Sequence, residues 1–81
     1  MSANRASKLV SAMLHEIAPE IDAASADVDA DLAEEFDLDS FAFLTLIELV
    51  HERTGIEVPE TDYRLVSSVA GLVSYLEARG V

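Results

Sequence analysis

The stretch from Phe36 to Pro59 decides the fold, and it reads FDLDSFAFLTLIELVHERTGIEVP. An aspartate and Ser40 stand immediately before a long apolar run, and both residue types favour the first position of a helix. These residues predict a helix that begins at Ser40. It is expected to end at Thr54, because Gly55 suits the left-handed residue that follows many helices. Residues 56–59 then read as a short extended link.

The flanking segments predict further helices. Upstream, apolar residues recur at the helical spacing i, i+3, i+4, i+7, i+8 and i+11, which predicts a helix over about residues 3–18 that ends before Pro19. Downstream, residues 61–66 suit one short helix, and Ser67 or Ser68 caps a final helix that ends at Gly80. No useful β-alternation is present. The 81 residues therefore predict a single all-α domain, a compact four-helix bundle of three longer helices and one short one.

A helical wheel of residues 40–54 separates a core side from a polar side. The core side is expected to hold Phe43, Leu44, Ile47 and Val50. The polar side is expected to hold Phe41, Thr45, Glu48 and Glu52. Because a large aromatic on a polar face is a plausible contact for another protein, we expect this second group to form a partner-docking surface.

The segment from Glu20 to Asp39 contains nine acidic residues and no Lys or Arg. It is longer than the roughly 4–6 residues of most connections, and long connections are often functional. Its apolar residues are expected to pin it to the core, and they are Val28, Leu32, Phe36 and Leu38. Although Asp27, Asp29 and Asp31 have the spacing of a calcium-binding loop, its required Gly and Glu positions are both leucine, so no metal site is expected.

The composition excludes several classes of function. A formal net charge of −11 disfavours nucleic acid and anionic membranes as partners, and it favours proteins with basic patches. No apolar run approaches the ~20 residues of a membrane span, and the residues after Arg5 and Lys8 lack a signal-peptide pattern. A soluble, cytoplasmic monomer is expected. Because the chain has no cysteine, a thiol needed for function has to come from a cofactor.

The segments DS (39–40), GIEVP (55–59) and VSSV (66–69) together resemble the acyl carrier protein family. That family has Asp-Ser before a helix, then Gly-Ile-Glu-Ile-Pro, a short helix, Thr-Thr-Val and a last helix. The resemblance covers nearly the whole chain. Taken alone, Asp39-Ser40 would more often be an ordinary helix cap, so it is the joint pattern that carries the assignment.

The resemblance implies that Ser40 accepts a 4′-phosphopantetheine arm from coenzyme A through a phosphopantetheinyl transferase. Asp39 would then orient the site and help to recruit the metal or basic groups of the transferase. Capping of the helix by Asp39 is equally compatible with this role, and both can hold at once. The arm would carry thioester-bound acyl or related groups in lipid or secondary-metabolite biosynthesis. The further partners would be acyl-loading and acyl-transfer enzymes with basic or apolar docking patches.

Two features depart from the housekeeping fatty-acid carrier and indicate a specialised stand-alone member. Phe41 replaces the usual leucine, and the helix has no acidic residue before Glu48. His15 and His51 have no metal-ligand spacing, and no nucleophile elbow surrounds Ser40, so we expect neither a catalytic site nor an enzyme. The alternatives are an unmodified helical adaptor that binds through the Phe41 face and an acidic, cation-binding or nucleic-acid-mimicking protein.

Overall fold

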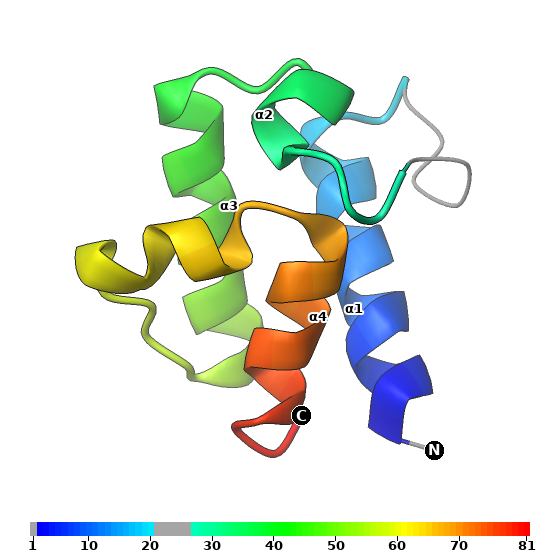
Figure 1. Ribbon diagram of the computed structural model, residues 1–81, viewed down its shortest axis with the longest axis vertical. Helices are drawn as coiled ribbons and strands as arrows, with labels where there is room; N and C mark the ends of the chain where they lie inside the picture. The colour runs from blue at the N-terminus through cyan, green and yellow to red at the C-terminus, as the bar shows by residue number, and fades with distance from the viewer. Residues whose placement is uncertain (1, 21–26) are drawn as a thin grey trace.

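Figure 1 shows the computed structural model, which describes residues 2–20 and 27–81. Its elements follow the order α1 (Ser2–Ile17), α2 (Leu32–Glu35), α3 (Ser40–Thr54), η2 (Glu60–Val66) and α4 (Val69–Glu77). Helix α1 packs against α3 and α4, and the 3₁₀ helix η2 packs against α4 and runs across the bundle. The beginning of α1 and the end of the chain lie at the same end of the molecule. The predicted all-α fold is confirmed, with one short helix, α2, added to the predicted set.

Helix α1 contributes one side of the core through the stripe that its sequence predicts. The four residues at its centre are fully buried, and they are Ala6, Val10, Met13 and Leu14. Leu9 and Ile17 are partly buried and pack at the edge of the same cluster. An ion pair of 2.7 Å between Glu16 and Arg53 joins the end of α1 to the end of α3.

Helix α3 begins at Ser40 and ends at Thr54, as predicted, but its buried face is rotated from the predicted one. Leu46, Ile47 and Val50 are buried, whereas Leu44 is 45% exposed. The prediction was therefore wrong for Leu44. Leu44 and Val50 are six residues apart, and at about 100° per residue their side chains lie roughly 120° apart, so Leu44 falls at the edge of the core sector. The sequence hides this rotation because apolar residues surround much of the helix.

The acidic segment before α3 is tied to the core by both side chains and backbone. Leu32, Phe36 and Leu38 are buried, as predicted. The prediction was wrong for the side chain of Val28, which is 48% exposed. Its carbonyl oxygen instead accepts the amide of Ala70 at 2.9 Å, so the backbone of this segment makes the contact with α4.

The junction between η2 and α4 is narrow. The N-cap of α4 is Ser68, whose hydroxyl accepts the amide of Gly71 at 3.0 Å, which decides between the two predicted caps. A Cβ atom at Gly71 would lie 2.4 Å from the carbonyl oxygen of Leu65, so only glycine permits this approach of η2 to α4. Among the helices of the described residues, none is long and apolar enough to cross a membrane.

Candidate functional site

Asp39 and Ser40 form the start of α3. Asp39 is the N-cap, with extended backbone angles, and its carboxylate accepts the amide of Ala42 at 2.8 Å. Ser40 is the first residue of the helix and is exposed. The capping role that sequence reasoning considered for Asp39 is therefore present in the structure. It leaves the adjacent serine accessible at the surface.

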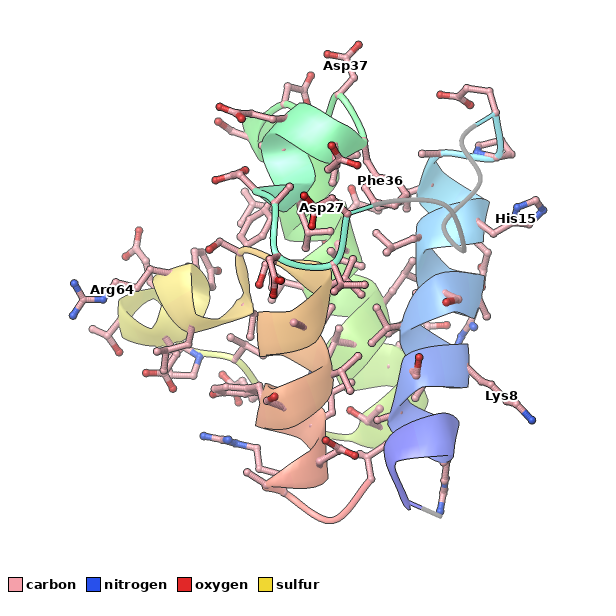
Figure 2. The ribbon with its side chains drawn as sticks, turned by 45° about the vertical axis from the view of Figure 1, so that its right-hand side comes forward. Lys8, His15, Asp27, Phe36, Asp37 and Arg64 are labelled. Atoms are coloured by element: carbon pink, nitrogen blue, oxygen red, sulfur yellow. The ribbon has the colours of Figure 1, made fainter. Side chains whose placement is uncertain are left out.

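The turn before Asp39 is anchored by buried side chains on either side of an exposed residue. Phe36 is only 2% exposed and points into the interior, while Asp37 projects outward at the top of the molecule (Figure 2). Asp37 has a φ of 51°, a left-handed conformation that aspartate tolerates better than most residues. The amide of Leu38 then donates to the carbonyl of Ala33 at 2.9 Å. This tight turn fixes the point at which α3 begins.

An open groove of about 600 Å³ lies beside Ser40. Its apolar lining comes from three parts of the chain, namely Ala33 and Leu38, then Phe43 and Leu44, then Tyr63. Asp39, Ser40 and Glu60 supply its polar side chains. Its volume lies within the range of about 300–1,000 Å³ that is typical of small-molecule sites. An apolar group tethered to Ser40 could therefore lie in a groove that the fold already provides.

The start of α3 at Ser40 offers a favourable helix dipole to a phosphodiester, while the carboxylates of Asp39 and Glu60 lie along the same groove. The amides of the first turn of a helix point outward from its N-terminus, where the positive end of the helix dipole favours an anion. The first turn of α3 contains no acidic residue, and His51 and Arg53 lie in its last turn. The carboxylate of Asp39 is turned toward the Ala42 amide. The exposed hydroxyl, the helix start and the apolar groove together fit a 4′-phosphopantetheine arm.

The residues predicted to dock a partner lie on one exposed side of α3. Phe41 is 80% exposed, and Glu48 and Glu52 are also exposed. Thr45 is half-buried, and its hydroxyl donates to the carbonyl of Phe41 at 3.1 Å. Leu44, which was wrongly predicted to lie in the core, is exposed and belongs to this side of α3. The sequence signal for its exposure was its position next to Glu48 on the helical wheel.

Sequence reasoning also missed the contribution of η2 to the groove. Glu60 and Tyr63 line it opposite residues of α3, and the rings of Tyr63 and Phe43 meet edge to face with centroids 5.5 Å apart. The only sequence signal was an aromatic residue in the short helix after Pro59.

Three carboxylates within residues 27–35 accept backbone amides of the same stretch. Asp31 caps α2 through the amide of Ala33 at 2.8 Å, and Asp27 accepts the amide of Asp29 at 3.0 Å. Glu35 accepts the amide of Asp27 at 3.0 Å. Within residues 2–20 and 27–81, no group of three or more His, Cys, Asp or Glu side chains is arranged to hold a metal ion.

Residues 8–76 match the sequence profile of a protein family described as the phosphopantetheine attachment site. The matched range contains Asp39, Ser40, all of α3 and η2, and most of α4. A search of curated proteins found no significant match.

Proposed function

Because the chain belongs to the phosphopantetheine attachment site family, we propose that Ser40 is the residue that bears its covalent 4′-phosphopantetheine arm. The family match confirms the predicted cofactor and identifies the chain as a phosphopantetheine-bearing carrier protein.

The observation that carries the assignment to Ser40 is its exposed hydroxyl at the first position of a long helix, beside the apolar groove. Two other serines near helix ends have different roles. The hydroxyl of Ser67 donates to the carbonyl of Arg64 at 2.8 Å, and that of Ser68 accepts the Gly71 amide. Both of these side chains are half-buried, so they are poor targets for a transferase.

The chain's own contribution to arm addition is the hydroxyl and its placement. The Ser40 oxygen would form a bond to the phosphorus that carries pantetheine in coenzyme A, and the bond from that phosphorus to the nucleotide would break. The hydroxyl proton would pass to a base of the transferase, which also supplies the metal. Once bound, the arm supplies the thiol that the chain lacks and so permits thioester chemistry.

We infer that partner enzymes dock on the surface of α3 formed by Phe41, Thr45, Glu48 and Glu52. Leu44 also belongs to this surface, because it is exposed. Phe41 would enter an apolar pocket of an acyl-loading or acyl-transfer enzyme, and the two glutamates would face basic residues. The cargo would be acyl or related groups in lipid or secondary-metabolite biosynthesis, handled in the cytoplasm. The carrier itself would perform no catalysis.

Incubation with coenzyme A, magnesium and a broad-specificity phosphopantetheinyl transferase tests the proposal. Peptide mapping should find one arm, on the peptide that contains Ser40. Ser40→Ala should abolish the addition and leave the helical circular-dichroism spectrum nearly unchanged, whereas Ser74→Ala, at another exposed serine, should still accept the arm. Addition that persists in Ser40→Ala, or that fails with several transferases, would refute the assignment.

A further inference from the structure

The helix η2 forms one wall of the groove beside Ser40, through Glu60 and Tyr63. A 3₁₀ helix has about three residues per turn, so the neighbours Asp62 and Tyr63 project from it roughly 120° apart. Tyr63 meets Phe43 of α3, whereas Asp62 meets residues of α4. The two neighbours therefore connect η2 to two different helices.

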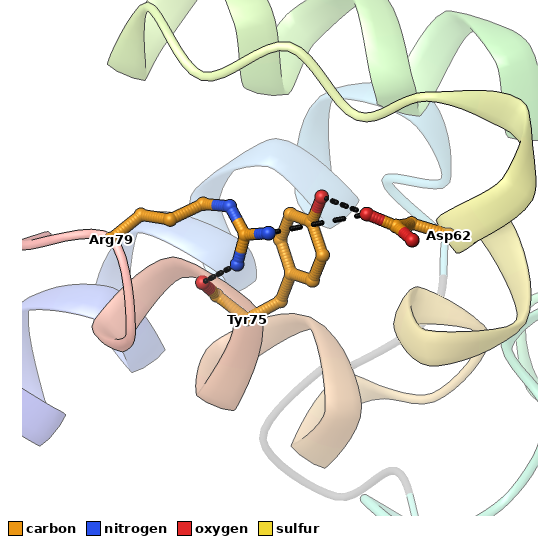
Figure 3. Close-up of polar contacts among 3 residues, drawn as sticks. All are labelled: Asp62, Tyr75 and Arg79. Atoms are coloured by element: carbon orange, nitrogen blue, oxygen red, sulfur yellow. Dashed lines mark hydrogen bonds and ion pairs between the residues drawn. The ribbon is translucent and has the colours of Figure 1, made fainter.

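Asp62, Tyr75 and Arg79 form a polar network on the α4 side (Figure 3). The hydroxyl of Tyr75 donates to Oδ2 of Asp62 at 2.7 Å, and Nη2 of Arg79 lies 3.9 Å from the same oxygen. The guanidinium carbon of Arg79 lies 3.5 Å from the centroid of the Tyr75 ring, and Nη1 donates to the Tyr75 carbonyl at 3.2 Å. Arg79 thus covers the ring whose hydroxyl holds Asp62.

This network attaches η2 to α4 through a strong and partly buried hydrogen bond. The Tyr75 side chain is only 6% exposed, and a hydrogen bond to a carboxylate is stronger than one between neutral groups. The contact with Phe43 on the other side of η2 is an edge-to-face contact of two aromatic rings, which is weaker than a hydrogen bond to a charged group. The last residue of η2, Val66, is fully buried and holds that end of the helix. The bond between Tyr75 and Asp62 therefore bears on the first half of η2, which carries Glu60 and Tyr63 and so forms one wall of the groove.

We infer that Tyr75 is a positioning residue for the groove. By its hydrogen bond to Asp62, it holds η2 in place so that Glu60 and Tyr63 form one wall of the groove beside Ser40. Where it concerns a group carried on the arm, this inference rests on the proposed function. Tyr75 itself is not among the residues that line the groove. Its hydroxyl contacts Asp62, on a side of η2 that does not face the groove.

Amide hydrogen exchange on the chain without the arm tests the positioning directly. Tyr75→Phe removes only the hydroxyl and keeps the ring under Arg79. Exchange of the amides in residues 60–66 should become about tenfold faster, since a hydrogen bond to a charged group contributes at least that factor. Exchange in α1 and α3 should change much less. Asp62→Asn keeps an oxygen that accepts the Tyr75 hydroxyl but loses the charge, so it should restore part of the protection that Asp62→Ala loses.

A matched control removes a polar contact elsewhere. Glu16→Gln weakens the ion pair with Arg53, which joins α1 to α3 and does not touch η2. It should leave exchange in residues 60–66 unchanged. If exchange rises equally in α1, α3 and η2 of Tyr75→Phe, the hydroxyl supports only global stability and the inference is wrong.

A second measurement concerns the groove itself. The chain is loaded with a medium-length acyl thioester on its arm, and cleavage of that thioester by hydroxylamine is followed by mass spectrometry. A loosened wall shields the thioester less, so Tyr75→Phe should lose the acyl group several-fold faster than the parent or Glu16→Gln. Equal rates would overturn the link to the groove. A failure to add the arm at Ser40 appears in the mass spectrum before loading and refutes the proposed function, and the exchange comparison then decides the role of Tyr75 by itself.

Discussion

The carboxylate of Asp39 accepts the amide of Ala42 across the first turn of α3, at a distance of 2.8 Å. The residue that directly precedes the proposed attachment serine is thus also the cap of the helix that presents this serine. A role in stabilising the helix and a role in recruiting a transferase can be separated, because the cap needs an oxygen whereas recruitment needs a charge.

Asp39→Ala should destabilise the domain by about 0.5–2 kcal/mol, the usual cost of losing an N-cap side chain. Asp39→Asn keeps a capping oxygen and should leave the thermal midpoint close to that of the parent. If the charge recruits the metal or basic groups of the transferase, Asp39→Asn should nevertheless slow arm addition. Thermal melts and the initial rate of arm addition measure the two effects. An unchanged midpoint in Asp39→Ala would show that the cap contributes little.

Phe41 and Ile47 lie on the same helix and differ in exposure, at 80% and 8%. Ile47→Ala should destabilise the domain by ~2–5 kcal/mol, enough to unfold many small domains. Phe41→Ala should change stability far less yet slow acyl loading or transfer by a cognate enzyme, since an exposed aromatic contributes mainly to binding. Thermal midpoints and transfer rates are compared for both variants. Equal unfolding by the two substitutions would show that Phe41 supports the core and would move the docking surface elsewhere.

The acidic segment before α3 should repel itself at neutral pH and low salt, because it holds nine acids between Glu20 and Asp39 without a Lys or Arg. Moderate salt, magnesium or calcium should raise the thermal midpoint. Asp37→Asn removes one exposed charge and keeps a residue that tolerates the left-handed backbone at this position. It should raise the midpoint at low salt and reduce its rise with added salt. A midpoint that stays flat or falls as salt is added would contradict the repulsion.

Burial of the Tyr75 side chain, followed by its hydrogen bond to Asp62, raises the pKa of its phenol above 10.0. As the pH rises past about 10, the unfolded chain loses this proton more readily than the folded chain, so stability present at lower pH is lost. The midpoint of the parent should therefore fall more steeply above pH 10 than that of Tyr75→Phe. Parallel curves for the parent and Tyr75→Phe would show that Tyr75 titrates alike in both states.

Local signals in the sequence sufficed where the structure depends on neighbouring residues. The ends of α3 follow from the cap at Asp39 and from Gly55, whose φ is 75°. The buried stripe of α1 follows from its helical spacing. In these elements, capping chemistry and periodicity point to the same answer.

Features that depend on tertiary packing were missed. Leu44 was predicted to lie in the core but is exposed. An apolar residue at the edge of a helical wheel is buried only if a neighbouring helix covers it, and the sequence of one helix does not show this. The one-turn helix α2 lies in a segment rich in acids and small residues, and it is stabilised by the cap at Asp31 and by buried Leu32. The groove beside Ser40 joins residues 33–44 to Glu60 and Tyr63, which no local pattern connects.

The central claim is that Ser40 carries the arm in the cell, and the most direct test is the intact mass of the chain purified from its native host, with fragment ions that locate any modification. The account predicts a species heavier than the bare chain by one 4′-phosphopantetheine, with the added mass on Ser40. A chain found entirely at its unmodified mass would favour an adaptor that binds through the Phe41 face, and an arm located on any other residue would contradict the assignment of the site.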